Sequence, residues 1–421
     1  MAFSSHAGSS PVSTIAESVA GRSKSLRQLW FPLAIYALTR LFAVVVIAIA
    51  GRHQIAVTTD LPEYHVAVPT SAAPGYWTIV TNWDGQWYRD IATHGYPADL
   101  PRDGTGHVTP NAWAFFPLFP LLVRLLMWMT SLNFEFVGSA VSVALGAAAM
   151  VVLFRLVKDA LGTMSAAAAT VLTCTFISAP VLQAAYTESL ALLLVSSCLL
   201  LLRRRRYVWT AGVIVLLALT RNVVLAMAPV ILLHGSVRYR ARAEDDFTTR
   251  DRLKVGGLVA LSVAATGLWP GIAAAATGEA SAYTQSSSAW QGGLHLLVGW
   301  PLKLYDVAGT WGLVVFFLML FCLYGLLAGR AARRWGPELW GWAVSYSAYL
   351  VLTTTFYSAT LRFLLLAFPL SLLAVDVFRS MGSRVIRTFL MGLTVFGGLV
   401  LQWFWIANFL VVTKPGQQPF P

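Results

Sequence analysis

The chain has 421 residues, of which 57% are apolar and only 11% are charged, against roughly 25% charged residues in a soluble globular protein. Neither a soluble core nor an intrinsically disordered chain, which is rich in charge, fits this composition, so we expect a membrane protein with several spans. The net charge of +12 does not indicate nucleic-acid binding, because the basic residues form short clusters between apolar segments and not one soluble face.

Apolar segments long enough to cross a bilayer recur along the chain, which predicts an all-α polytopic membrane protein. We expect a cytoplasmic N-terminal tail at 1–28, a transmembrane domain at 29–412 and an extracytoplasmic tail at 413–421. Eleven spans are predicted, near 29–50, 136–155, 162–182, 187–202, 207–220, 222–236, 255–276, 308–328, 338–356, 361–377 and 388–412.

The fifth and sixth predicted spans are short and meet at Arg221-Asn222, so they could instead form one longer helix. The positive-inside rule favours a hairpin of two short helices, because the arginine clusters on either side, 203–206 and 238–242, are both cytoplasmic only if the chain crosses twice. The same rule makes 115–129 an interfacial or re-entrant helix, since a further span there would reverse every later loop.

The predicted orientation puts the N-terminus in the cytoplasm. The cytoplasmic segments then contain 21 of the 30 Lys and Arg residues, and the remaining nine lie elsewhere. Two extracytoplasmic loops are prominent: 51–135, which is long, polar and rich in aromatic residues, and 277–306. The cytoplasmic loops are short and contain no nucleotide-binding motif, so we expect any chemistry on the extracytoplasmic face.

The first large loop contains the densest group of candidate functional residues. As a short helix, it would carry Asp84 and Tyr88 on one face, with Trp83 and Trp87 beside them. A carboxylate among aromatic rings at a membrane surface can act as a general base. The alternative is that Asp84 only caps the helix, a common position for Asp.

Three further charged residues lie where apolar spans begin or turn. Glu188 opens the fourth span, Arg221 and its neighbour Asn222 form the tip of the short hairpin, and Arg362 opens the tenth span. A carboxylate or guanidinium at this depth is costly unless it faces a polar cavity, and Arg binds phosphate in a bidentate manner. The alternatives are stabilisation of a helix N-terminus by Glu188 and snorkelling of the two arginines to lipid headgroups.

No metal or cofactor is predicted. The histidines His94, His107 and His295 lack the spacing of metal ligands, and no spacing requires Asp84 and Asp90 to share an ion. The three cysteines lie inside apolar runs and suggest no disulfide framework.

Four segments, taken in order, resemble the PIG-V family, the GPI mannosyltransferase II type. The first combines Trp83-Asp84-Gly85-Gln86-Trp87-Tyr88 with His94-Gly95-Tyr96. The others are Phe115-Phe116-Pro117-Leu118-Phe119-Pro120, Tyr186-Thr187-Glu188-Ser189-Leu190 and Thr220-Arg221-Asn222. The similarity covers roughly residues 35–235, and the rest of the chain matches mainly by hydropathy.

This resemblance implies a GT-C glycosyltransferase, a multi-span enzyme that takes a sugar, here mannose, from a polyprenyl-phosphate carrier. It implies that Asp84 is the catalytic base, Glu188 a cavity carboxylate and Arg221 a ligand of the donor phosphate. The implied partners are a lipid-linked sugar donor, a lipid or glycan acceptor and the surrounding membrane lipids.

Three other functions are compatible with the sequence. A glycolipid transporter or flippase predicts paired buried charges and repeat symmetry, and the sequence shows no repeat. A non-catalytic membrane subunit would tolerate loss of Asp84. A GT-C enzyme of another specificity, such as an arabinosyl- or protein O-mannosyltransferase, would share the same motifs.

Overall fold

The computed structural model describes residues 11–58, 66–291 and 297–414. The α-helices are α1 (Pro11–Ala50), α2 (Tyr76–Ile79), α3 (Asp84–His94), α4 (Leu118–Thr130), α5 (Phe134–Leu161), α6 (Thr163–Cys174), α7 (Glu188–Arg203), α8 (Tyr207–Ala218), α9 (Met227–Arg240), α10 (Thr249–Ala264), α11 (Leu268–Thr277), α12 (Ala282–Gln291), α13 (Gly299–Ala308), α14 (Thr310–Ala328), α15 (Arg330–Arg333), α16 (Pro337–Thr353), α17 (Thr360–Phe363), α18 (Ser371–Ser380) and α19 (Arg384–Trp405). The described residues contain no β-strand and only two isolated bridges, so the all-α prediction is confirmed.

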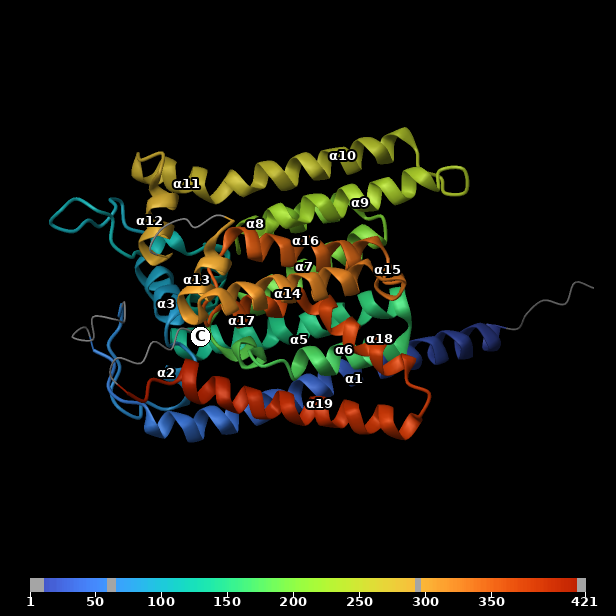
Figure 1. Ribbon diagram of the computed structural model, residues 1–421, viewed down its shortest axis with the longest axis horizontal. Helices are drawn as coiled ribbons and strands as arrows, with labels where there is room; N and C mark the ends of the chain where they lie inside the picture. The colour runs from blue at the N-terminus through green and yellow to red at the C-terminus, as the bar shows by residue number, and fades with distance from the viewer. Residues whose placement is uncertain (1–10, 59–65, 292–296, 415–421) are drawn as a thin grey trace, which may run out of the picture.

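The long helices run side by side along the molecule, and the short helices α2, α3 and α12 gather at one end (Figure 1). Each of the eleven predicted spans coincides with a helix or with consecutive helices. Six helical stretches are long and apolar enough to cross a membrane, and α6 and α8 are shorter apolar helices. Two boundaries differ from the prediction: α1 begins at Pro11, and the loop expected at 277–306 contains α12 and most of α13.

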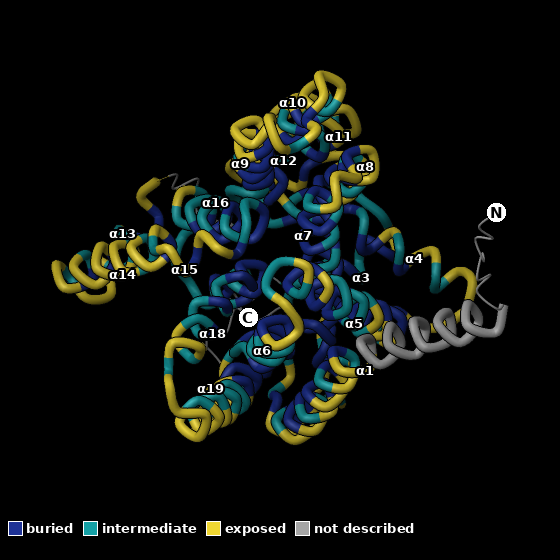
Figure 2. The backbone as a smooth tube through the Cα atoms, turned by 90° about the vertical axis from the view of Figure 1, so that its right-hand side faces the viewer, coloured by how far each residue is buried: buried dark blue, intermediate teal, exposed yellow. Residues whose placement is uncertain are grey.

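Two predictions about short helices agree with the structure. The hairpin at Arg221 exists, since α8 ends at Ala218 and α9 begins at Met227. The segment predicted to be interfacial forms α4, which runs across the view in Figure 2, whereas α1, α5 and α6 are seen nearly end-on. Thus α4 lies across the direction of the bundle, as an interfacial helix does.

The chain between α6 and α7 is not α-helical, although it lies deep in the bundle. Its 3₁₀ turn, Ala179–Gln183, is buried at every residue. Backbone groups in this position need partners, because neither lipid nor water reaches them. Four side chains from α1, α5 and α7 donate hydrogen bonds to the carbonyl groups of this turn. The donors are Tyr36, Arg40, Ser139 and Ser189. Arg40, which lies midway along the first predicted span, therefore supports the fold.

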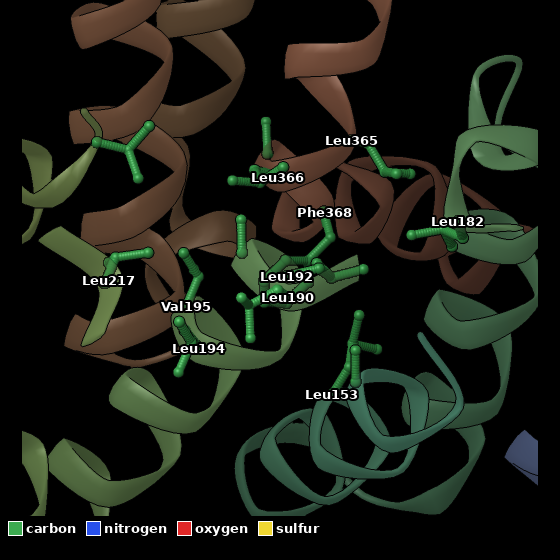
Figure 3. Close-up of a cluster of buried hydrophobic side chains, with 14 of the residues drawn as sticks. Leu153, Leu182, Leu190, Leu192, Leu194, Val195, Leu217, Leu365, Leu366 and Phe368 are labelled. Atoms are coloured by element: carbon green, nitrogen blue, oxygen red, sulfur yellow. The ribbon is translucent and has the colours of Figure 1, made fainter. Parts of the chain in front are cut away.

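Close packing holds the central helices together, because lipid is as apolar as the protein interior and apolar burial alone gives little driving force. Figure 3 shows buried leucines of α5, α7 and the 3₁₀ segment Leu364–Leu370 gathered in one cluster. Gly146 of α5 shows how close this packing is: a Cβ atom there would lie 2.2 Å from the hydroxyl oxygen of Tyr36 and 3.1 Å from that of Ser189. This glycine lets α1, α5 and α7 meet.

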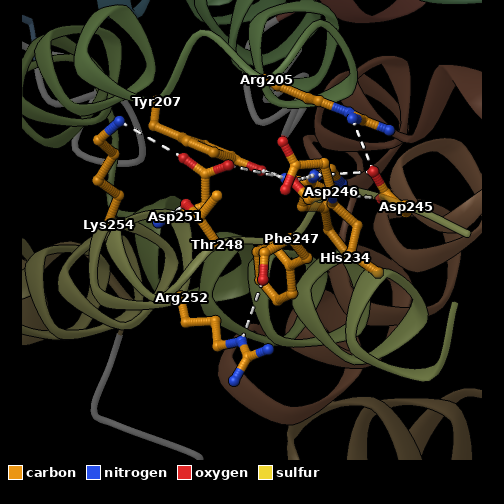
Figure 4. Close-up of polar contacts among 11 residues, drawn as sticks. Arg205, Tyr207, His234, Asp245, Asp246, Phe247, Thr248, Asp251, Arg252 and Lys254 are labelled. Atoms are coloured by element: carbon orange, nitrogen blue, oxygen red, sulfur yellow. Dashed lines mark hydrogen bonds and ion pairs between the residues drawn. The ribbon is translucent and has the colours of Figure 1, made fainter. Parts of the chain in front are cut away.

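A polar cluster closes the end of the bundle opposite α3 (Figures 1 and 4). Arg238 donates to both carboxylate oxygens of Asp245 at 2.7 and 3.0 Å and to the hydroxyl of Tyr207 at 2.6 Å. Arg205 also pairs with Asp245 at 2.8 Å. The arginine cluster 203–206 and Asp84 consequently lie at opposite ends of the molecule.

Candidate active site

Asp84 is the first residue of α3, and the residue before it has an unusual backbone. Trp83 has φ +57° and ψ −119°, a region that a residue with a side chain rarely adopts and that costs about 1–3 kcal/mol. Trp83 is the N-cap residue, and its side chain makes no capping hydrogen bond. The proposed role of Asp84 as an N-cap is therefore wrong.

The strained turn is held by the chain that follows α19. The indole Nε1 of Trp83 donates to the carbonyl of Leu410 at 3.0 Å, and the amide of Asn82 donates to the same carbonyl at 3.2 Å. Asn82 also donates to Gln54 at 2.8 Å. These contacts fix the direction in which α3 presents its first carboxylate.

Asp84 is the outermost member of a line of four charged side chains. Arg362 of α17 donates to Asp84 Oδ2 through Nη1 at 2.6 Å, and its Nε lies 3.1 Å from Glu188 Oε1. Arg221 donates to the same oxygen of Glu188 at 2.6 Å. The order is thus Asp84, Arg362, Glu188, Arg221, with two positive and two negative charges.

Because these side chains are buried, the stability of each charged form depends on its oppositely charged neighbours. The side chains of Glu188 and Arg362 are only 1% and 7% exposed, and that of Arg221 is 16% exposed. Removing one partner from such a set typically costs about 3–5 kcal/mol, because the remaining charge is buried without compensation. The alternative that Arg221 and Arg362 snorkel to lipid headgroups is therefore wrong.

Aromatic rings set the positions of the two guanidinium groups. The Arg221 guanidinium lies 4.8 Å from the centre of the Phe363 ring, and that of Arg362 lies 5.0 Å from the centre of the Tyr186 ring. The Tyr186 hydroxyl in turn donates to the carbonyl of Asn82 at 2.8 Å. The start of α7, the hairpin tip and α17 are thus joined to the turn before Asp84.

A cavity of about 750 Å³ opens beside these residues. Its walls include all of the predicted site residues except Glu188, that is, Trp83, Asp84, Trp87, Tyr88, Arg221, Asn222 and Arg362. Glu188 lies behind the wall and reaches the cavity only through the two arginines. The Asp84 side chain is 31% exposed, and with Oδ2 bonded to Arg362, Oδ1 has no hydrogen bond to any described residue.

An aromatic wall flanks Asp84. The Trp87 ring is parallel to that of Phe115 at 5.9 Å, and the Trp290 ring meets both edge-on at 5.1 and 5.4 Å. Tyr88 is buried and donates to the hydroxyl of Thr187 at 3.4 Å. Burial raises the pKa of Tyr88 above its ordinary value, so its hydroxyl remains a proton donor.

Sequence reasoning missed part of this cavity. Lys303 of α13 and a group of hydroxyl-bearing residues also line it, namely Tyr283, Thr284, Ser287, Tyr346, Tyr349, Thr353, Thr354, Thr355 and Tyr357. These residues come from α12, α13, α16 and the loop after α16, which no motif singled out. The signal that could have found Lys303 is its exception to the positive-inside rule, as a lysine in a segment assigned to the outer face.

The other acidic residues considered as metal ligands serve local structure. Asp90 pairs with His94 at 2.8 Å, and Asp103 accepts hydrogen bonds from Thr105 and from the backbone of His107. Within residues 11–58, 66–291 and 297–414, no three His, Cys, Asp or Glu side chains are grouped so that they could hold a metal ion. His295 lies outside the described residues.

No known family model matches the sequence, and no curated protein is significantly similar to it. Among solved structures, the chain is similar to ArnT from Cupriavidus metallidurans bound to undecaprenyl phosphate, with a TM-score of 0.50 and 14% identity over 88% of this chain and 69% of that one. It is also similar to the Archaeoglobus fulgidus oligosaccharyltransferase tethered with an acceptor peptide, with a TM-score of 0.50 and 13% identity over 92% of this chain and 56% of that one.

The chain thus spans little more than half the length of that oligosaccharyltransferase. At such low identity, the likeness defines the fold. The protein is an all-α polytopic membrane protein with the GT-C fold.

Proposed function

We propose that this protein is a membrane glycosyltransferase that moves a sugar from a polyprenyl-phosphate donor to a lipid-linked or cell-envelope acceptor on the extracytoplasmic face. The observation that carries the proposal is the position of Asp84 on the wall of a large cavity, bonded to a buried arginine. The ArnT structure described above was solved with undecaprenyl phosphate, which supports a lipid-linked donor.

Asp84 acts as the general base in this proposal. Its carboxylate takes the proton of an acceptor hydroxyl, and the hydroxyl oxygen forms a bond to the anomeric carbon of the sugar. The bond between that carbon and the phosphate oxygen breaks, and the polyprenyl phosphate leaves with the bonding electrons. Attack opposite the leaving group inverts the anomeric configuration.

Arg362 orients the base, and Arg221 extends the polar wall. Each guanidinium has five N–H donors, and the bonds to Asp84 and Glu188 occupy only some of them. The remaining donors can bind phosphate oxygens as charge develops on the leaving group. Trp83, Trp87, Tyr88 and Asn222 would contact the substrates, because they line the same cavity.

The transferred sugar is proposed to be mannose. Support for this comes from the resemblance of the segments at Asp84, Phe115, Glu188 and Arg221 to the PIG-V family. All four segments reach one cavity wall, the third through Thr187, while its Glu188 lies behind that wall.

Transfer by the purified protein tests this function. The full chain in liposomes is given radiolabelled polyprenyl-phosphate mannose and an extract of envelope glycolipids, and wild type is compared with Asp84→Asn. General-base catalysis contributes about 10²- to 10⁴-fold, so transfer by Asp84→Asn should fall by at least about 100-fold. Asp99→Asn, in an exposed part of the same loop, is the matched control and should keep wild-type activity.

Two results contradict the proposal. Undiminished transfer by Asp84→Asn excludes its role as the base. Movement of the donor lipid across the bilayer without sugar transfer identifies a flippase instead.

A further inference from the structure

Lys303 is the one cation on the cavity wall whose charge no described carboxylate balances. The charged residues that line the cavity are Asp84, Arg221, Lys303 and Arg362. The two arginines are neutralised by Asp84 and Glu188, at 2.6 to 3.1 Å. Among the described residues, no carboxylate lies within ion-pair distance of the Lys303 ammonium, so the site has a net charge of about +1.

The packing of α13 directs Lys303 to the cavity. A Cβ atom at Gly299 would lie 2.6 Å from the carbonyl oxygen of Thr354 and 2.9 Å from Thr355 Oγ1, so this face of α13 touches the loop that follows α16. Trp300 fixes the contact by donating to the Thr354 hydroxyl at 3.0 Å. Lys303 follows Gly299 by one helical turn and therefore lies on the same face.

Nearby hydroxyl groups do not substitute for this charge. Thr353 and Thr354 donate to the main-chain carbonyls of Tyr349 and Leu350, both at 2.7 Å. The Thr354 hydroxyl also accepts a hydrogen bond from the indole of Trp300, so it already acts as both donor and acceptor. An anion entering this part of the cavity would find the Lys303 ammonium as its strongest partner.

A second face of α13 is exposed. Leu302, Tyr305 and Val307 are 51%, 50% and 74% exposed. An exposed apolar helix face beside a transmembrane bundle is typical of a helix at the membrane interface, where it meets the acyl chains. A ligand that fits both surroundings has an anionic head in the cavity and a hydrocarbon tail beside α13.

We infer that Lys303 binds the phosphodiester of the lipid-linked sugar donor before the reaction, while Arg221 and Arg362 stay paired with Glu188 and Asp84 and use their remaining N–H donors only as charge develops on the leaving phosphate. This inference rests on the proposed function. A phosphodiester carries one negative charge, which matches the single unbalanced positive charge of the cavity. The lysine is a binding residue, and the proton transfer at Asp84 does not involve it.

Binding and transfer are measured separately to test the inference. The full chain in phosphatidylcholine nanodiscs is titrated with undecaprenyl phosphate, and with inorganic phosphate to distinguish a lipid-linked from a free anion. Wild type, Lys303→Gln, Lys303→Arg and Asp84→Asn are compared, with Lys254→Gln as a matched control because it pairs with Asp251 in the α9–α10 region.

Loss of the ammonium should weaken lipid binding by about 10- to 100-fold, the usual effect of removing a hydrogen bond to a charged group. Lys303→Arg should stay within about threefold of wild type because its charge is kept. In the transfer assay, Lys303→Gln should raise KM for the donor more than it lowers kcat, whereas Asp84→Asn should bind the lipid and lose kcat.

The outcomes separate this inference from the proposed function. If Lys303→Gln binds undecaprenyl phosphate as wild type does while wild type transfers sugar, the assignment of Lys303 is wrong and the enzyme proposal stands. If inorganic phosphate binds as tightly as the lipid, the donor assignment is wrong. If wild type neither binds the lipid nor transfers sugar, both proposals fall together.

Discussion

Arg362 contacts two carboxylates that come from distant parts of the sequence. Asp84 precedes it by 278 residues, and both residues pair only because α3 and α17 meet at one end of the bundle. Hydropathy and motif spacing identified each residue as a candidate, since charges at the edge of apolar spans are costly. The pairing itself could not be predicted, because nothing local in the sequence records which charge meets which.

Glu188 is predicted to stabilise both arginines. Glu188→Gln should lower the free energy of unfolding by about 3–5 kcal/mol and reduce transfer, because Arg221 would lose the carboxylate it pairs with and Arg362 would keep only Asp84. Arg221→Met alone should also destabilise. Thermal unfolding of the detergent-solubilised protein, calibrated by a denaturant series, measures both effects.

The double variant Glu188→Gln/Arg221→Met provides the control. It leaves the pair of Asp84 and Arg362 intact, so its effect should be smaller than the sum of the single effects by about 0.5–3 kcal/mol. If the losses of unfolding free energy in the two single variants simply add up in the double variant, Glu188 and Arg221 are not energetically coupled.

At the scale of elements, hydropathy predicted the helices well and their interruptions poorly. The helices at the eleven predicted spans, the hairpin at Arg221 and the helix α4 agree with expectations from apolar length and the positive-inside rule, and six helical stretches are long and apolar enough to cross a membrane. The 3₁₀ turn Ala179–Gln183 could not be predicted in this way, because the side chains that bond its carbonyl groups come from three other helices. Lys303 was missed for a similar reason, since only the packing of Gly299 brings α13 to the cavity.

Gly146 should be intolerant of a side chain. Gly146→Ala places a methyl group against Tyr36 and Ser189, and overpacking of this kind costs about 1–3 kcal/mol. The measurement is the unfolding temperature in detergent. Tyr36→Phe added to Gly146→Ala should recover part of the loss, because it removes the closest atom.

Gly212 is the matched control for this prediction. It lies inside α8, and a Cβ atom added there would have no neighbouring atom within 4 Å, so Gly212→Ala should stabilise the protein by about 0.5–1 kcal/mol. Equal effects of the two substitutions would mean that the meeting of α1, α5 and α7 does not depend on Gly146.

At the scale of the whole molecule, charge separates the two ends of the bundle. Asp84 and its cavity lie at one end, and the arginine cluster 203–206 lies with Asp245 at the other. The excess of basic residues at the second end predicts that this end faces the cytoplasm.

Labelling by a thiol reagent that does not cross membranes tests this orientation. In intact cells, a cysteine at Asp99 should react and one at Arg204 should react only after the membrane is permeabilised. Both substitutions are made in a Cys322→Ser background, because Cys322 is exposed whereas Cys174 and Cys198 are buried. Reaction at Arg204 in sealed cells would reverse the topology and remove the extracytoplasmic site.

The carbonyl of Leu410 has a consequence for biosynthesis. It holds Trp83 across 327 residues of sequence, so the turn that orients Asp84 lacks its support until nearly all of the described chain has been made. A growing polypeptide that has not yet made α19 and the residues after it would lack the two hydrogen bonds that Asn82 and Trp83 donate to this carbonyl. The segment that follows α19 thus completes the support of a turn that was synthesised long before it.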